Sequence, residues 1–313
     1  MKQYLGVDIG GTAVKLGIVD ELGNILSTHH HEVAFDQYET PIIETVKHAI
    51  DEFFDLYQIN AKDLEGIGVS ATGQIDYRSG VVIGVGGNIK NWCETPIKEE
   101  LEKKFHLKTT VINDANSMVM GEKWIGRGKG YHNIIGITIG TGVGGGTIIK
   151  DEILHGMRGI AGEIGHFSID QKGVVCTCGN VGCYEQYASM SALVKKVKQN
   201  DQELNLSVRY NEINGKVIFD ELEAGNEKIQ LIVEEWITSI SKGIISLVHL
   251  FNPQLVLIGG GVCTQEEHFI KPIRSYVLKH VMEQFAKDLE IEAATLGNQA
   301  GLVGAVYYHL KQS

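Results

Sequence analysis

A glycine turn between two strand-like segments occurs twice in the chain, and this repetition limits the folds that the chain can adopt. The first turn contains Gly10 and Gly11, and the second begins at Gly140. A shift of 130 residues places Asp8 over Thr138. In both places the order is strand, glycine turn, strand and acidic turn. Few residues are identical, but the shared order predicts two related halves.

The remaining pattern indicates a mixed sheet covered by helices. Strands are expected at residues 3–9, 13–19, 25–33, 66–70, 109–112, 134–139, 255–258 and 290–295. Helices are expected at residues 39–57, 97–105, 115–124, 227–250 and 266–285, and from residue 298 onward. Short turns make the start of the sheet antiparallel, and the later alternation of strands and helices makes it partly parallel. This α/β pattern resembles the actin, Hsp70 and sugar kinase superfold, in which two related actin-like (ribonuclease H-like) domains surround a cleft for nucleotide and sugar.

The chain is long enough for two domains, at 313 residues. We expect an N-terminal domain at 1–118, joined by the C-terminal helix 299–313, and a second domain at 119–298. The formal net charge of -11 disfavours nucleic acid and anionic membranes as partners. The sequence shows neither a signal peptide nor an apolar run of about 20 residues, so a cytoplasmic location with reduced cysteines is expected.

The first glycine turn (residues 8–12) has the composition of a phosphate-binding turn. Bare backbone at Gly10 and Gly11 allows N–H groups to approach phosphate oxygens, and Thr12 adds a hydroxyl donor. Asp8 could hold Mg²⁺ through water, and Lys15 offers a further phosphate contact. Taken alone, the motif fits an ordinary hairpin turn equally well.

The second glycine turn (residues 140–146) has five glycines in seven positions, which an ordinary hairpin does not need. Its spacing also matches the G-x-G-x-x-G pattern of dinucleotide-binding domains, but that pattern requires a helix to start at the turn. The β-branched residues 147–149 predict a strand instead. The chain contains no G-x-x-x-x-G-K-[ST] loop, which excludes a P-loop kinase.

Three of the five cysteines lie close together and have a histidine nearby. His166, Cys176, Cys178 and Cys183 match a closed tetrahedral zinc site, whereas the alternative is a group of buried thiols. Because protein atoms would fill all four positions, a structural role is expected. Cys93 and Cys263 are expected to be ordinary thiols. The triplet at residues 29–31 is interpreted as a solvated strand end rather than a metal-binding tract.

Several of these segments together resemble the ROK family of bacterial sugar kinases and related repressors. They are residues 8–12, 139–146, 162–166 and 176–185. The resemblance implies an ATP-dependent kinase that phosphorylates the 6-hydroxyl of a hexose, most simply glucose, and needs Mg²⁺ with structural Zn²⁺. N-acetylmannosamine and β-glucosides remain alternative substrates. The resemblance also suggests a homodimer.

The family roles carry over only at matching positions. Asp114 would be the catalytic base, although an N-cap of the following helix is an alternative reading. The substrate-binding set implied by the resemblance is Gly73, Asn88, Asn113, Asp114, Glu163, His166 and Glu185. The nucleotide-binding set is Asp8, Gly10, Gly11, Thr12, Lys15, Thr141, Gly142, Gly260 and Gly261.

The sequence departs from the family pattern at two places in the sugar region. Residues 88–92 read Asn-Ile-Lys-Asn-Trp instead of Asn-Leu-Pro-Gly-Trp, and Thr72 replaces a usual Pro. Both departures concern the choice of sugar. A ROK-type repressor is a second interpretation, but its helix-turn-helix would precede the first phosphate turn, which here begins at Asp8. A sugar sensor without catalysis would be expected to lose the base or the phosphate-binding glycines.

Overall fold

The computed structural model describes residues 1–33, 36–84 and 89–312, and it forms two compact units. Unit 1 contains residues 1–132, 146–162 and the C-terminal segment from Thr295. Unit 2 contains residues 133–145 and 163–294. The expected boundary at residue 118 falls inside α3 (Asp114–Ile125), which lies wholly in unit 1.

Unit 1 is built on a five-stranded sheet with the order β3-β2-β1-β4-β7. The strands are β1 (Gln3–Ile9), β2 (Ala13–Asp20), β3 (Ile25–Glu32), β4 (Ile67–Ala71) and β7 (Thr109–Asn113). β1 pairs antiparallel with β2, and β2 with β3, whereas β1–β4 and β4–β7 are parallel. A short hairpin, β5 (Gln74–Asp76) and β6 (Val81–Gly84), was not expected from the sequence.

The second sheet repeats this topology. Its order is β10-β9-β8-β11-β12, and the parallel pairs β8–β11 and β11–β12 match those of the first sheet. The strands are β8 (Ile134–Ile139), β9 (Val143–Ile149), β10 (Glu152–Ile153), β11 (Leu255–Gly259) and β12 (Glu290–Ala293). The boundary between the units passes through β9. The predicted relationship between the two halves is therefore confirmed by strand order.

The helices of unit 1 are α1, α2, α3 and α12. Their bounds are α1 Ile42–Tyr57, α2 Ile97–Phe105, α3 Asp114–Ile125 and α12 Ala300–Gln312. α1 buries its apolar stripe on the sheet, including Ile42, Val46 and Phe53, and it ends where Gln58 adopts a left-handed conformation. This is the period expected of an amphipathic helix.

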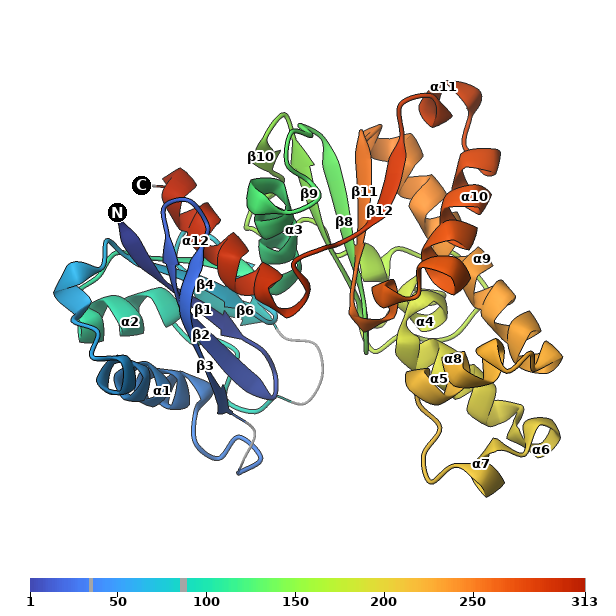
Figure 1. Ribbon diagram of the computed structural model, residues 1–313, viewed down its shortest axis with the longest axis horizontal. Helices are drawn as coiled ribbons and strands as arrows, with labels where there is room; N and C mark the ends of the chain where they lie inside the picture. The colour runs from blue at the N-terminus through green and yellow to red at the C-terminus, as the bar shows by residue number, and fades with distance from the viewer. Residues whose placement is uncertain (34–35, 85–88, 313) are drawn as a thin grey trace. The chain divides into compact units, whose positions relative to one another are not determined.

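Helix α12 packs closely on α3 and on the first sheet, as Figure 1 shows for the red helix beside the blue strands. A Cβ atom at Gly304 would lie 1.7 Å from the Ser117 carbonyl oxygen, and one at Gly121 would lie 2.5 Å from that of Ala300. The Ser117 hydroxyl also donates to the Gly301 carbonyl over 2.7 Å. These glycines let the two helix backbones touch, which explains why α3 belongs to unit 1.

Unit 2 surrounds its sheet strands with helices, of which α9 is the longest. The bounds are α4 Glu185–Ala188, α5 Met190–Gln199, α6 Asp201–Leu204, α7 Leu206–Arg209, α8 Gly215–Glu223, α9 Glu227–Phe251, α10 Lys271–His280 and α11 Glu283–Ala286. The helix expected at 266–285 begins as a π-helical turn (Glu266–Ile270) that runs into α10. It is interrupted before α11, where the buried Val281 adopts an extended conformation.

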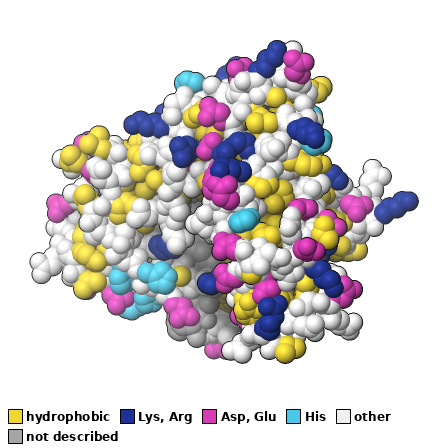
Figure 2. Space-filling view, turned by 45° about the vertical axis from the view of Figure 1, so that its right-hand side comes forward, with side chains coloured by type: hydrophobic (Ala, Val, Ile, Leu, Met, Phe, Trp, Pro, Cys, Tyr) yellow, Lys and Arg dark blue, Asp and Glu magenta, His cyan; other side chains and the backbone are white. Residues whose placement is uncertain are grey.

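The face of the molecule drawn in Figure 2 carries basic and acidic side chains intermixed, without a large field of one sign. Among the described residues, none of the helices combines the length and the apolar character needed to cross a bilayer.

Candidate functional site

The structure distributes the predicted site residues between the two units. Unit 1 contains Asp8, Gly10, Gly11, Thr12, Lys15, Gly73, Asn113 and Asp114. Unit 2 contains Thr141, Gly142, Glu163, His166, Cys176, Cys178, Cys183, Glu185, Gly260 and Gly261. Asn88 lies outside the described residues.

The first glycine turn joins β1 to β2 and is closed by a hydrogen bond from the Gly10 N–H to the Ala13 carbonyl, over 2.9 Å. The Asp8 carboxylate accepts from the Ser70 hydroxyl over 2.7 Å and lies 3.5 Å from the Lys15 ammonium. A Cβ atom at Gly301 would lie 2.6 Å from an Asp8 oxygen. Asp8 is therefore held by both neighbouring strands and by the start of α12, so its carboxylate has a fixed position.

Asn113, and not Asp114, caps α3. The Asn113 side-chain oxygen accepts hydrogen bonds from the backbone N–H groups of Ala115 and Asn116, at 3.0 and 3.3 Å. Asp114 is the first residue of the helix and is exposed. The N-cap explanation for Asp114 is thereby removed, because the adjacent amide already performs that function.

Asn113 also orders the residues around it. Its amide group donates to the Gly73 carbonyl and to an Asp114 carboxylate oxygen, both over 2.9 Å. Gly73 has a φ of 99°, a left-handed conformation that favours glycine. The preceding carbonyl, that of Thr72, accepts from the indole N–H of the buried Trp92 over 2.9 Å. Trp92 thus anchors the Thr72–Gly73 turn, a role that the sequence pattern did not reveal.

The second glycine turn is bound to the start of α4. The Val143 N–H donates to the Glu185 carboxylate over 2.9 Å. A Cβ atom at Gly142 would lie 2.4 Å from the same carboxylate oxygen, so this contact depends on the missing side chain. The carbonyl of Gly140 accepts from the Met190 N–H over 2.9 Å. Two bonds therefore tie the turn to the first residues of α4 and α5.

Gly260 is sterically required after β11. Its φ is 112°, and a Cβ atom there would lie 2.0 Å from the Ile139 carbonyl oxygen. The neighbouring Gly261 is different, because a Cβ atom there would meet nothing within 4 Å. Gly260 therefore lets β11 turn away directly beside the end of β8.

A large cavity lies within unit 2, beside both of these glycine segments. It has a volume of about 1040 Å³. The lining includes Gly140 and Thr141 on one side, Gly261 on another, and one face of α5 together with the start of α8. Its size suits a nucleotide-sized ligand. The α5 face includes Met190, Val194 and Lys198, whose i, i+4 spacing is a signal in the sequence for one face of a helix.

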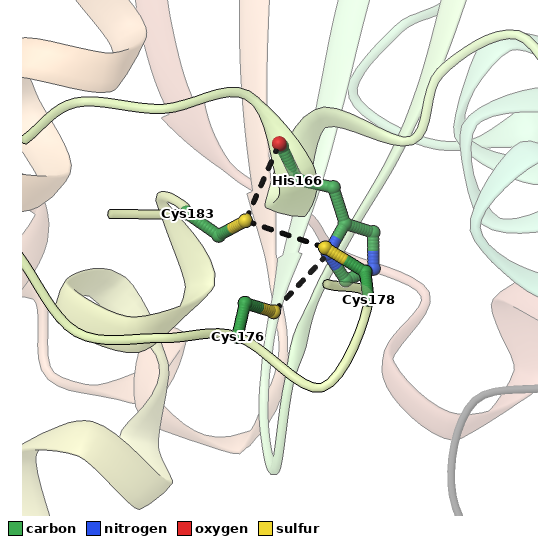
Figure 3. Close-up of side chains that lie close together, drawn as sticks. All are labelled: His166, Cys176, Cys178 and Cys183. Carbon is green, nitrogen blue, oxygen red and sulfur yellow. Dashed lines mark hydrogen bonds between the residues drawn. The ribbon is translucent and has the colours of Figure 1, made fainter. Parts of the chain in front are cut away.

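The Cys–His cluster consists of His166, Cys176, Cys178 and Cys183, drawn in Figure 3. One candidate ligand atom from each residue lies within 4.8 Å of the others. The Cys178 and Cys183 sulfur atoms are 3.5 Å apart, and the Cys176 sulfur is 3.7 Å from the Nδ1 atom of His166. Zinc–sulfur bonds of about 2.3 Å in a tetrahedron separate the sulfur atoms by about 3.8 Å. The donor set and its spacing therefore fit a zinc ion.

The orientation of His166 matters for the neighbouring site. The Nδ1 atom of His166 faces the Cys176 sulfur. The Nε2 atom is the other ring nitrogen, so it can contact a different group. Glu163 precedes the 3-10 turn that contains His166, and its carbonyl accepts from the His166 N–H over 3.0 Å. The side chain of Glu163 is exposed.

Tyr184 connects the Cys–His cluster to α9. It lies between Cys183 and Glu185, it is fully buried, and its hydroxyl donates to the Ile240 carbonyl over 2.8 Å. Its ring stacks on Phe167 and leaves no space for a Cβ atom at Gly243, which would lie 2.3 Å from the ring. Tyr184 therefore fixes the position from which Glu185 reaches Val143.

Comparison with known proteins agrees with this architecture. The profile of the ROK family matches residues 4–312. The chain is 36% identical over 311 residues to a glucokinase of Streptomyces coelicolor, covering 96% of this chain and 95% of that protein. It is 34% identical over 307 residues to a β-glucoside kinase of Listeria monocytogenes, covering 97% and 96%.

Among solved structures, a ROK family glucokinase from Streptomyces griseus in complex with glucose and AMPPNP superposes with a TM-score of 0.84. The two chains are 32% identical, and the match covers 99% of this chain and 100% of the other. The chain belongs to the ROK family.

Proposed function

We propose that this chain is an ATP-dependent sugar kinase that transfers the γ-phosphoryl group to the 6-hydroxyl of a hexose, with glucose as the first candidate. Its membership of the ROK family supports the reaction class. The observation that carries the assignment of the base is the capping of α3 by Asn113, which leaves Asp114 at the helix start without that task.

In this proposal Asp114 accepts the proton of the sugar hydroxyl as its oxygen attacks the phosphorus atom. Such proton transfer contributes about 10² to 10⁴ in rate. Asn113 acts as a positioning residue, because its amide is already bonded to Gly73 and Asp114. The Ala115 N–H donates to the Asp114 carboxylate over 2.8 Å, which restricts its orientation.

The sugar hydroxyls are assigned to Glu163, to the Nε2 atom of His166 and to Glu185. Glu185 uses one carboxylate oxygen for the Val143 N–H, and the other oxygen is the acceptor that we assign to the sugar. Zn²⁺, held by the Cys–His cluster, would have a structural role, because protein atoms complete its tetrahedron.

On the nucleotide side, we assign the triphosphate to the two glycine turns and the adenosine to the cavity in unit 2. Backbone N–H groups at Gly10, Gly11 and Gly142 are the donors, assisted by the hydroxyls of Thr12 and Thr141. Mg²⁺ neutralises triphosphate charge when it is bound, and Asp8 is the carboxylate that we assign to it through water. Lys15 is held beside Asp8 and is assigned to phosphate.

The test is an ADP-release assay with ATP and a panel of glucose, other hexoses, N-acetylmannosamine and β-glucosides. We expect turnover with at least one of these sugars, and a fall of about 10² to 10⁴ in kcat for Asp114→Asn with little change in sugar affinity. Asp63→Asn, an exposed carboxylate in a 3-10 turn of the same unit, is the matched control.

The panel also decides among substrates, since the highest kcat/KM identifies the preferred sugar. Turnover of only a β-glucoside or only N-acetylmannosamine would support the kinase reaction but would replace glucose as the proposed substrate. If the folded protein bound sugar but released no ADP with any of them, the kinase proposal would be rejected in favour of a sugar sensor.

A further inference from the structure

A group of histidine and acidic side chains that has no part in the proposed kinase site lies on β3 and α1 of unit 1. β3 is an edge strand of the first sheet. Because side chains alternate along a strand, His29 and His31 share a face, and His30 points to the other. On α1, His48 and Glu52 are four residues apart and so lie on one side of the helix. Figure 2 shows histidine side chains gathered beside acidic ones on one face of the molecule.

The two elements bring these side chains into contact. The Nδ1 atom of His31 is 3.3 Å from a Glu52 carboxylate oxygen, and the Nε2 atom of His29 is 3.9 Å from the same oxygen. Candidate ligand atoms of His29, His31 and Glu52 all lie within 4.8 Å of one another. The ring of His48 is 6.1 Å from that of His31.

His29 supplies an independent observation. Its Nε2 atom is buried and has no hydrogen-bond partner within bonding distance among the described residues. A buried polar atom without a partner is costly, so such atoms in native structures usually have a ligand, water or ion. The His29 ring stacks on Phe53, with 6.0 Å between ring centroids, which holds this nitrogen toward Glu52. The strand end therefore differs from the solvated end that the sequence suggested.

We propose that His29, His31 and Glu52 form a second metal site, for a divalent transition-metal ion of the zinc type, separate from the Cys–His cluster. Two imidazoles and one carboxylate are ligands that suit such ions. Three protein ligands converge among the described residues, so water or His48 completes the coordination. The side chains of His29, His31 and Glu52 are 20%, 28% and 49% exposed, so the ion exchanges with solvent, unlike an ion enclosed by thiolates.

The bound ion joins the edge strand β3 to α1. An ion that binds only when these elements are in place stabilises the folded protein. The alternative is a simple ion pair between protonated histidine and Glu52, which needs no metal.

The experiment measures zinc binding to the full chain by equilibrium dialysis with metal analysis, and thermal unfolding with and without added zinc. The variants are His31→Gln and Glu52→Gln, and the matched control is His30→Gln on the opposite face of β3. We expect the unmodified protein and His30→Gln to bind one zinc ion more per chain than the two site variants. Loss of a ligand should weaken binding at this site at least tenfold, as an order of magnitude. Added zinc should raise the Tm of the unmodified protein and of His30→Gln only.

Equal zinc content in all four proteins would overturn the proposal in favour of the ion pair. An equal loss in His30→Gln would overturn it as well, because that side chain does not face the site. Glu52→Gln keeps the shape of a half-exposed side chain, so it decides the question if His31→Gln does not fold. The readouts do not depend on catalysis, so they are independent of the kinase proposal.

Discussion

The backbone N–H of Val143 donates to the Glu185 carboxylate over 2.9 Å, although the two residues are 42 positions apart in the chain. This bond joins the second glycine turn to the segment that follows the Cys–His cluster. Glu185 lies two residues after Cys183, and buried Tyr184 fixes the link between them. A change at the Cys–His cluster is therefore expected to reach the proposed phosphate and sugar contacts through one short segment.

Replacing Glu185 tests this link directly. Glu185→Ala removes the acceptor for the Val143 N–H and should lower kcat/KM for the sugar by about 10- to 100-fold, the cost of losing a charged hydrogen bond. Glu185→Gln keeps an acceptor oxygen of the same shape, so it should lose less. The measurement is steady-state kinetics on both variants. Equal losses would mean that the negative charge matters and the bond to Val143 does not.

The steric argument at Gly260 gives a second prediction. Gly260→Ala combines a left-handed backbone with a Cβ atom placed 2.0 Å from a backbone oxygen, and should cost about 2–4 kcal/mol of unfolding free energy. Gly261→Ala meets no atom within 4 Å and should change stability by less than about 0.5 kcal/mol. Denaturant unfolding measures both. A similar cost for the two variants would refute the steric explanation.

The Cys–His cluster gives a third prediction. Cys176→Ser should lose zinc, lower the Tm and raise the KM for sugar, because His166 and Glu185 would lose their common support. Zinc analysis, thermal unfolding and sugar kinetics measure the three effects. The control is Cys93→Ser, an exposed cysteine outside the cluster, which should match the unmodified protein. Full zinc content in Cys176→Ser would contradict the assignment of this residue as a ligand.

Much of the fold could be predicted from the sequence because its signals are local. The alternating and apolar runs predicted the strands of both sheets, and the apolar spacing of α9 predicted a helix over nearly its whole length. The repeated strand order follows from the same glycine turns. The helices from α4 to α8 were missed. Of these, α4, α6 and α7 have only four residues, too few to show a helical period.

The contacts that position the candidate site were less accessible from the sequence. The cysteine spacing predicted the donor set, since all four donors lie in one short segment. The sequence offered Asp114 as a possible N-cap of the following helix, whereas the structure gives that position to Asn113. The bonds from Trp92 to Thr72 and from Val143 to Glu185 join distant segments, and no local pattern specifies such pairs.

The same limit applies to the histidines of β3. Alternation along the strand places His29 and His31 on one face. Helical spacing likewise places His48 and Glu52 on one side of α1. Only the packing of α1 against the sheet brings Glu52 to the two histidines, and this packing depends on the whole core of unit 1. A group of metal-binding side chains that is divided between a strand and a helix has no local sequence pattern, so sequence analysis does not detect it.

The wall of the cavity in unit 2 depends on a buried charge in α8. The Glu221 carboxylate accepts two hydrogen bonds from the Arg209 guanidinium, at 2.7 and 2.9 Å. Tyr210 and Asn226 donate to it as well, at 2.7 and 3.0 Å. The hydrogen bonds from Arg209 are the main reason why the pKa of Glu221 is lowered to about 2. Burial opposes this shift but is outweighed.

A carboxyl group whose pKa is depressed in the folded state stabilises the protein above its unfolded pKa, which is about 4.3 for glutamate. That stabilisation is lost as the pH falls from about 4.3 towards 2, where the folded group takes up its proton. Glu221→Gln lacks this titration, so its Tm should lie below that of the unmodified protein at pH 7 and approach it as the pH falls below about 4.

Glu223→Gln, an exposed neighbour in α8, should follow the unmodified protein at every pH. Thermal unfolding of the three proteins from pH 7 to pH 3 makes the comparison. All three share the same Cys–His cluster, so its response to acid does not affect the differences between them. A constant difference between Glu221→Gln and the unmodified protein would show that Glu221 acts through its shape and hydrogen bonds, and that its charge contributes no stability.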